Sequence, residues 1–357
     1  RGFGQYLSMS GIRSTYCLLP AVAILWLVSA CSSQNPGRAA TEIAGATMGT
    51  TYSIKLIGLP AELNEDRIRE RVDAILEGVN ERMSTYRDDS ELSRFNQAGH
   101  TAWFSVSREL LDVLTEAQRV SDATEGAFDV TVGPLVDLWG FGPPRAQDDQ
   151  IPAQRNIDGA RARVGYQGLA LKDSPPSVRK FRPDIQVDLS AIAKGYAVDR
   201  LAAYFDTLGV DNYLIEIGGE IKARGLSAKQ RPWRIAIERP SSGARSVQTV
   251  VELEDAGLAT SGDYRNYFER DGLRYSHAID PLSGRPVTHR LASVTVVDSS
   301  VMRADAWATA LLVLGPEKGL RLADEQGIAA YLIVAAGDDF ETRATQAFAG
   351  YLPAAAE

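Results

Sequence analysis

The segment from Tyr275 to Pro286 reads Tyr-Ser-His-Ala-Ile-Asp-Pro-Leu-Ser-Gly-Arg-Pro. It holds one of only three histidines among 357 residues, and His277 stands three positions before Asp280. Pro281 and the Ser283-Gly284 pair favour a tight turn just after this carboxylate. A ring able to act as a base and a carboxylate fixed at one turn are typical of a reactive site. The alternative is a surface hairpin in which Asp280 caps the turn and His277 has a purely structural role.

The regions on either side of this segment predict the fold class. On its N-terminal side, short apolar or alternating runs predict strands near 213–217, 233–237, 247–253 and 257–260, and a further strand at 274–279 runs into the segment itself. On its C-terminal side we expect a strand at 291–297, a helix at 303–314 ending at Gly315, a helix opened by Pro316, and a closing strand at 328–334. This mixture lacks the regular alternation of a doubly wound sheet. It predicts a single large α+β domain with several antiparallel strands and packed helices.

The first half of the domain adds more helices to this mixture. Residues 42–57 begin the fold, with the alternation of a half-buried strand over 50–56. Helices are expected at 62–83, at roughly 107–122, and from Ser190 as the capping residue to about Leu208. The remaining expectations are a strand turning into a short helix at 128–141, a polar surface excursion at 143–158, and a strand end at 187–189.

The N-terminal region has the layout of a secretory signal. Met9 is the plausible initiator, and an apolar run from Cys17 to Val28 is short for a membrane span. The sequence Val-Ser-Ala-Cys that ends at Cys31 is similar to a bacterial lipobox. We therefore expect a signal peptide over 1–30, and a lipidated Cys31 with a flexible tether over 31–41. The alternatives are a plain N-terminal anchor or a chance cysteine. We expect the protein to lie in the periplasm, anchored by its lipid to a bacterial membrane. Of the two bacterial membranes, the inner one is favoured.

Cysteine content and charge exclude several classes of function. The only two cysteines are Cys17 and Cys31, so the expected mature domain has no thiol for a disulfide, a zinc site or nucleophilic catalysis. The net charge of −8 is spread evenly along the chain. No Lys/Arg cluster interleaves with aromatic residues, so we expect no nucleic-acid partner.

Two short patterns could bind a metal ion and a phosphate. Asp305 and Thr309 are four residues apart on a predicted helix, so both oxygens face the same side, as a Mg²⁺ site requires. The junction from Asp188 to Gly195 leads from a strand into a helix whose first amides, with Lys194, suit an anion. The spacing is not that of a P-loop. Taken alone, each pattern favours an ordinary helix start over a binding site.

An ordered series of short motifs resembles the ApbE family of FAD:protein FMN transferases over roughly residues 42–335. No single motif is specific, but their joint order is. The motifs are Met48-Gly-Thr-Thr-Tyr52, Met83-Ser-Thr-Tyr86, Ser93-x-Phe95-Asn96, Phe128-Asp-Val-Thr131, Asp188-Leu-Ser-x-Ile-Ala-Lys-Gly195, Gly218-Gly219, Thr260-Ser-Gly-x-Tyr264, Ser276-His-x-Ile-Asp-Pro281 and Ala304-Asp-Ala-x-Ala-Thr-Ala310.

The resemblance implies a transferase domain over 42–353 that uses FAD as the FMN donor and Mg²⁺ as cofactor. In such a reaction a threonine or serine hydroxyl of a target protein attacks the flavin-side phosphorus. AMP leaves, and FMN stays attached through a phosphodiester. By the same resemblance, Mg²⁺ is held by Asp305, Thr309 and the backbone carbonyl of Ala191, which replaces a common glycine. The implied FAD-binding residues are Met48, Tyr86, Ala127, Phe128, Asp129, Asp188, Lys194 and Ile279.

The hydroxyl nucleophile needs a base, and His277 is the best-placed candidate because its ring titrates near neutrality. Asp280 could orient that ring or act as the base itself. The resemblance implies, as acceptors, flavoprotein subunits of membrane electron-transfer complexes that carry an Asp-x-x-Ser/Thr-Gly-Ala-Ser/Thr motif. The segment 280–286 begins like that motif, but Pro286 stands at the acceptor position. Two other functions stay open: FAD storage without transfer, and hydrolysis of FAD to FMN and AMP.

Overall fold

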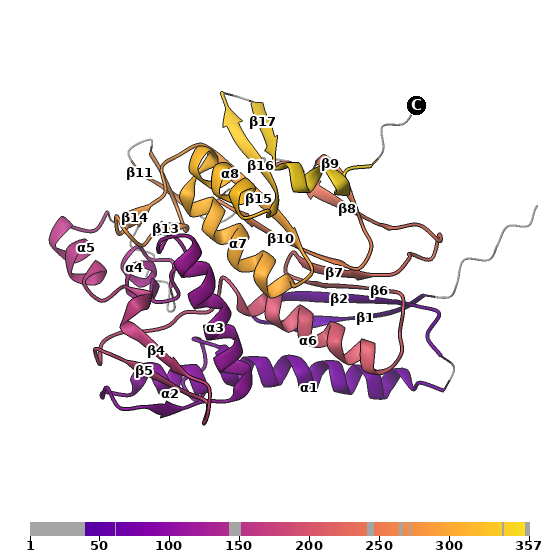
Figure 1. Ribbon diagram of the computed structural model, residues 1–357, viewed down its shortest axis with the longest axis horizontal. Coiled ribbons are helices and arrows are strands. Elements are labelled where there is room, and N and C mark those ends of the chain that lie inside the picture. The colour runs from indigo at the N-terminus through magenta and orange to yellow at the C-terminus, as the bar shows by residue number, and fades with distance from the viewer. Residues whose placement is uncertain are drawn as a thin grey trace, which may run out of the picture. The chain divides into compact units, whose positions relative to one another are not determined.

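An antiparallel eight-stranded sheet runs through the protein in the order β1-β2-β6-β7-β10-β15-β16-β17 (Figure 1). Its strands are β1 (Ala40–Thr47), β2 (Thr50–Ile57), β6 (Tyr213–Ile217), β7 (Glu220–Arg224), β10 (Ala256–Gly262), β15 (Leu291–Asp298), β16 (Ala329–Ala336) and β17 (Asp339–Ala344). Alternation along the strands gives the sheet two apolar faces. In β16, Leu332 belongs to the large core on one face, whereas Tyr331 and Ile333 belong to a smaller core on the other.

The computed structural model describes residues 40–60, 62–142, 151–240, 246–263, 267–270, 273–337 and 339–353. These residues fall within one compact unit that spans 37–357, which agrees with the predicted single α+β domain. The predicted signal peptide from Met9, residues 31–39 of the predicted tether with Cys31, Tyr264 and residues 143–150 of the predicted excursion lie outside the described residues. The last two residues of the predicted tether, 40 and 41, already belong to β1. No helix in the described ranges is both long enough and apolar enough to cross a membrane.

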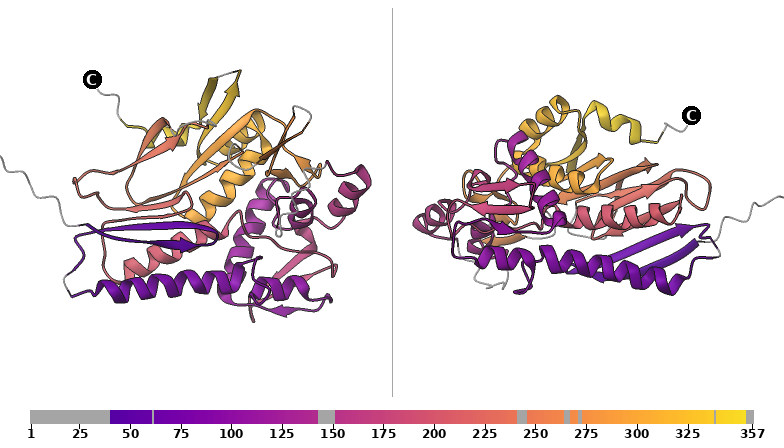
Figure 2. Two further views of the ribbon diagram at one scale, coloured as in Figure 1. Left: turned by 180° about the vertical axis from the view of Figure 1, so that it is seen from behind. Right: turned by 60° about the horizontal axis from the view of Figure 1, so that its bottom comes forward.

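Helices cover one face of the large sheet (Figures 1 and 2). The covering helices are α1 (Glu65–Met83), α6 (Ala193–Thr207), α7 (Val301–Leu314) and α8 (Pro316–Glu325). Helix α7 packs on β10 and β15 and contacts α6 on its flank. It is buried on nearly all sides, which explains why its sequence is apolar around the whole helix rather than along one stripe. The other face carries the hairpin β8 (Trp233–Glu238)–β9 (Val247–Leu253) and a short 3₁₀ helix, η2 (Gln346–Tyr351).

A second group of elements gathers at one end of the helical layer, at the left of Figure 1. Helix α3 joins this group to the layer through its contacts with α1 and α7. The group contains α2 (Glu91–Gln97), α3 (Arg108–Ala123), α4 (Gly133–Leu138), α5 (Gln154–Arg161), the 3₁₀ turn η1 (Tyr166–Gly168), and the sheet of β3 (Phe104–Ser105), β5 (Ser177–Lys180) and β4 (Leu169–Lys172). Two small ladders complete the fold, β11 (Tyr267–Arg270)–β12 (Leu273–Ser276) and β13 (Ile279–Asp280)–β14 (Arg285–Pro286).

The position of α7 is fixed by α6. The Asp199 carboxylate on α6 accepts hydrogen bonds from the Ser300 hydroxyl (2.8 Å) and from the backbone N–H groups of Val301 and Met302 (3.0 Å each). These bonds satisfy amides that the first turn of a helix leaves unpaired. The helices approach so closely at Gly195 that a Cβ there would lie 2.4 Å from the Val301 carbonyl oxygen. Only glycine fits at that contact.

Most predicted elements are confirmed, and three expectations about local structure were wrong. Segment 128–141 contains α4 but no strand, and residues 187–189 form no strand. Their backbone groups bond elsewhere: Asp188 N–H donates to the Val130 carbonyl (2.7 Å), and Val187 N–H donates to the Asn96 side chain (2.8 Å). Ser190 does not cap α6, because that helix begins at Ala193 with Ile192 at the N-cap and no side-chain cap.

Candidate active site

Lys194 lies between two buried carboxylates where α6, α7 and β7 meet. Its Nζ is 2.8 Å from Glu220 Oε1 and 3.8 Å from Asp305 Oδ2. Glu220 opens β7, Asp305 lies on α7, and their exposed fractions are only 2% and 3%. Asp305 Oδ2 also accepts a hydrogen bond from Gly195 N–H (3.1 Å). The fold thus joins the predicted phosphate-binding helix start to the predicted metal-binding helix.

With both carboxylates ionised, this buried cluster would carry one more negative than positive charge. Burial, which outweighs the attraction of Lys194, raises the pKa of Glu220 to about 8. Burial likewise raises the pKa of Asp305. For Lys194, burial opposes the charged form, but Asp305 and Glu220 together raise its pKa above the ordinary value. One ammonium serves two carboxylates, so an additional cation at this place would be favourable.

Oxygen atoms that could bind a hard cation lie beside Asp305. Thr309 is one turn further along α7, and its hydroxyl lies 3.0 Å from the Ser261 hydroxyl of β10. The Gly195 amide, four residues after Ala191, donates its hydrogen bond to Asp305 instead of to the Ala191 carbonyl. Among the described residues, no hydrogen bond to that carbonyl is present. In the same ranges no three His, Cys, Asp or Glu side chains cluster as a metal site. A cation here would therefore need hydroxyl and carbonyl oxygens besides Asp305, as Mg²⁺ accepts.

The predicted FAD-binding residues around 127–129 are buried beside Asp188. Ala127, Phe128 and Asp129 are nearly inaccessible to solvent. The Asp129 carboxylate accepts hydrogen bonds from Thr131 N–H (2.7 Å), the Thr131 hydroxyl (2.6 Å) and Tyr166 N–H (2.9 Å). Burial nevertheless raises the pKa of Asp129. These hydrogen bonds show that Asp129 fixes the conformation of its loop. The hydrogen bond from Asp188 N–H to the Val130 carbonyl holds the two predicted segments together.

Met48 and Tyr86 lie in two different turns. Met48 forms the β1–β2 turn with a φ of +49° and packs against the large core. Tyr86 lies between α1 and α2 with 73% of its surface exposed. The Met48 turn lies next to the Gly218-Gly219 turn that leads to Glu220, because Gly218 N–H donates to the Thr51 carbonyl (3.1 Å). The predicted contact of Met48 and Tyr86 with FAD stays a prediction.

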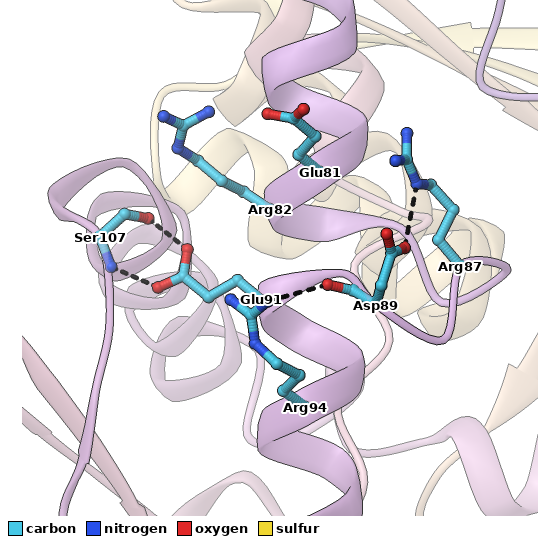
Figure 3. Close-up of a pocket in the computed structure, with 7 residues that line it drawn as sticks. All are labelled: Glu81, Arg82, Arg87, Asp89, Glu91, Arg94 and Ser107. Carbon is cyan, nitrogen blue, oxygen red and sulfur yellow. Dashed lines mark hydrogen bonds and ion pairs between the residues drawn. The ribbon is translucent and has the colours of Figure 1, made fainter.

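A polar hollow of about 500 Å³ lies near the Tyr86 loop (Figure 3). Its arginines and carboxylates largely neutralise one another. Arg87 bonds Asp89 (3.4 Å), and the Glu91 carboxylate accepts hydrogen bonds from the Ser107 amide and hydroxyl. The lining residues are Glu81, Arg82, Arg87, Asp89, Glu91, Arg94 and Ser107. None of them is a predicted site residue, although Arg87 directly follows Tyr86 in the chain.

The predicted turn after His277 is confirmed. Asp280 accepts hydrogen bonds from Leu282 N–H (2.9 Å) and Ser283 N–H (3.3 Å), so both of its oxygens are used within the turn. His277 is partly buried, and its ring meets that of Phe141 edge-on with centroids 6.3 Å apart. Ile279 is buried in a small apolar core with Leu135 and Trp139, and this packing anchors the start of the turn. These contacts give Asp280 a capping role and fix the segment that carries His277.

This segment also lies close to the helix of Asp305, because β13 contacts α7. The fold therefore places the segment that follows the predicted base against α7, the helix that carries Asp305 and Thr309 and whose Asp305 pairs with Lys194. Glu220 and the contact of Ser261 with Thr309 were not among the site features predicted from the sequence. The signal for Glu220 was its position directly after Gly218-Gly219, where an acidic residue opens a strand in the middle of the sheet.

Known proteins are similar to this chain in both sequence and fold. The sequence model of the ApbE family matches residues 48–332. The FAD:protein FMN transferase of Vibrio cholerae is 48% identical over 334 residues, which are 94% of this chain and 98% of that relative. The corresponding enzyme of Escherichia coli K12 is 40% identical over 336 residues, 92% of this chain and 95% of that relative.

Solved structures agree with the sequence relatives. The flavin transferase ApbE from Vibrio cholerae has a TM-score of 0.82 at 47% identity, covering 88% of this chain and 100% of that one. The apo flavinyl transferase ApbE of Pseudomonas stutzeri has a TM-score of 0.81 at 42% identity, covering 89% and 98%. Family motifs and family fold coincide along nearly the whole described chain, which therefore belongs to the ApbE family.

Proposed function

We propose that this protein transfers FMN from FAD to a hydroxyl group of a target protein and releases AMP. Its membership of the ApbE family and its relatives named as FAD:protein FMN transferases support the proposal. The observation that carries it is the pairing of Lys194, in the first turn of α6, with Asp305 on α7, one turn before Thr309. Among the described residues, the Ala191 carbonyl just before α6 accepts no hydrogen bond. Such a cluster suits a metal-bound pyrophosphate.

The residues fit a Mg²⁺ ion by the chemistry of their donor atoms. Asp305, Thr309 and the Ala191 carbonyl would hold it, since they offer one carboxylate and two neutral oxygens. When bound, Mg²⁺ would neutralise charge on the pyrophosphate of FAD and on the leaving AMP. The amides at the α6 N-terminus favour negative charge for the same reason.

In the proposed reaction, the acceptor oxygen forms a bond to the flavin-side phosphorus as the bond from that phosphorus to AMP breaks. The acceptor hydroxyl loses its proton, and His277 is the residue that we assign to take it up. Asp280 fixes the turn that carries His277 rather than serving as the base, because both of its oxygens accept turn amides. FAD would be surrounded by the residues that the resemblance implies for its binding, which are the buried 127–129 loop, Met48, Tyr86, Asp188, Lys194 and Ile279.

The acceptor and the location of the reaction are part of this proposal. A lipid on Cys31 would hold the domain at a bacterial membrane on the periplasmic side. The acceptors would then be exported or membrane-bound electron-transfer subunits with the Asp-x-x-Ser/Thr-Gly-Ala-Ser/Thr motif. The sequence Val-Ser-Ala-Cys and the polar residues after it support this location.

One experiment separates transfer from hydrolysis and from storage. The protein is incubated with FAD, Mg²⁺ and an acceptor domain, and the mass of the acceptor and the released AMP are both measured. Transfer predicts one attached FMN for each AMP released. Hydrolysis predicts AMP and free FMN with an unmodified acceptor, and storage predicts neither product. Either of the last two results would contradict the proposed function.

A further inference from the structure

Glu220 is a buried acid that the mechanism above does not use. It lies in β7, between β6 and β10 in the middle of the large sheet, where α7 contacts the strand. Only 2% of the residue is exposed. Burying a carboxylate costs several kcal/mol unless charges and hydrogen bonds compensate it. Its presence at this place therefore needs a physical reason.

The compensation that the chain supplies is incomplete. Glu220 Oε1 is paired with the Lys194 ammonium at 2.8 Å, but the same ammonium is shared with Asp305 Oδ2 at 3.8 Å. The other oxygen, Oε2, is buried and has no hydrogen-bond partner among the described residues. Buried polar atoms without a partner are rare in folded proteins. The free oxygen thus points to a ligand that binds next to the Lys194 cluster.

The position next to Asp305 indicates what that ligand is. When both carboxylates are ionised, the single ammonium leaves a buried excess of one negative charge. The ligand that favours this ionised state should therefore be a cation, or a water molecule bound to a cation. Mg²⁺ usually keeps several of its water molecules when it binds through one or two carboxylates. Carboxylates that accept hydrogen bonds around a metal site orient its direct ligands and strengthen binding.

We propose that Glu220 is the second carboxylate of the cation site: Oε2 accepts a hydrogen bond from a metal-bound water, and Oε1 keeps Lys194 beside Asp305. This assignment rests on the proposed function, because that function supplies the cation. Glu220 is a positioning residue in this account and does not touch FAD. Its purely structural alternative is that it only anchors Lys194 within the core.

Glu220→Gln distinguishes the two roles. Glutamine keeps the volume and one oxygen for Lys194, but it places an NH₂ group where an acceptor is needed. The probe is Mn²⁺, which takes the same hard oxygen ligands, titrated into FAD-saturated protein while free Mn²⁺ is measured by electron paramagnetic resonance. Chromatography of the same samples verifies that FAD remains intact. We expect the Mn²⁺ dissociation constant to rise roughly 10- to 100-fold.

Glu91→Gln is the matched control, because the Glu91 carboxylate is also partly buried but both of its oxygens accept hydrogen bonds from Ser107. Its Mn²⁺ affinity should equal that of the unmodified protein.

Glu220→Asp provides a second test, because it keeps the negative charge but shortens the side chain. It should also weaken Mn²⁺ binding. Unchanged Mn²⁺ affinity in either folded Glu220 variant, even with a lower melting temperature, would overturn the assignment. Failure of the unmodified protein to bind Mn²⁺ with FAD would overturn the proposed metal site as well.

Discussion

Removing the Asp199 carboxylate should loosen the helix that carries Asp305. Asp199 accepts three hydrogen bonds from the first turn of α7, at 2.8, 3.0 and 3.0 Å. Val301 is buried there, so its amide would lose its partner with little access to water. A hydrogen bond to a charged group contributes about 1.5–3 kcal/mol. Since the three bonds share one carboxylate and are not additive, we expect Asp199→Ala to lower the free energy of unfolding by about 3 kcal/mol.

Urea unfolding followed by tryptophan fluorescence measures this loss. The midpoint should fall while the dependence of the free energy on urea stays the same, because the surface exposed on unfolding is unchanged. Asp112→Ala is the control, since Asp112 makes only an exposed contact with Arg108 at 3.8 Å on α3, and we expect little change from it. A loss below about 0.5 kcal/mol for Asp199→Ala would refute the view that α6 holds α7 in place through this carboxylate.

Three further predictions concern the base, the buried acid and the acceptor. His277→Ala should keep FAD affinity and slow transfer roughly 10²- to 10⁴-fold in single-turnover assays; weaker FAD binding at an unchanged rate would make it a binding residue. Because the pKa of Glu220 rises from 4.5 to about 8, the folded state keeps a proton that the unfolded chain has lost. Without ligands, the unfolding free energy should fall by up to about 1.4 kcal/mol per pH unit between these values, and Glu220→Gln should flatten the decline; equal slopes would contradict the assigned cause. With FAD and Mg²⁺ alone, the protein should gain no FMN mass, since Pro286 offers no hydroxyl; a gain of one FMN would disprove this.

Much of the fold was predictable because its cause is local. The nearly continuous buried runs of β15 and β16 and the apolar length of α7 follow from the sequence alone. The region 187–192 was not predictable in the same way. Its backbone groups are satisfied by Asn96 and by the loop at Val130, which are distant in sequence. Residues 187–192 were therefore predicted to be a strand end and a helix cap, whereas the structure shows an irregular connection.

The same distinction applies to the site. Asp305 and Thr309 were recognisable because helix geometry alone puts them on one side. Glu220 was not, because it becomes part of the site only through Lys194, which the packing of α6 against β7 brings to it. Asp280 carried two readings at the sequence level, and its bonds to the Leu282 and Ser283 amides favour the capping one.

Asp305→Ala tests the central claim, that the cluster on α7 carries out FMN transfer, most directly. The variant and the unmodified protein are incubated with FAD, Mg²⁺ and an acceptor domain, and the acceptor is examined for flavin fluorescence in a denaturing gel and for mass. Circular dichroism verifies that the variant is folded. We predict one attached FMN with the unmodified protein and none with folded Asp305→Ala or in excess EDTA. Flavinylation at the normal rate by the variant would contradict the account.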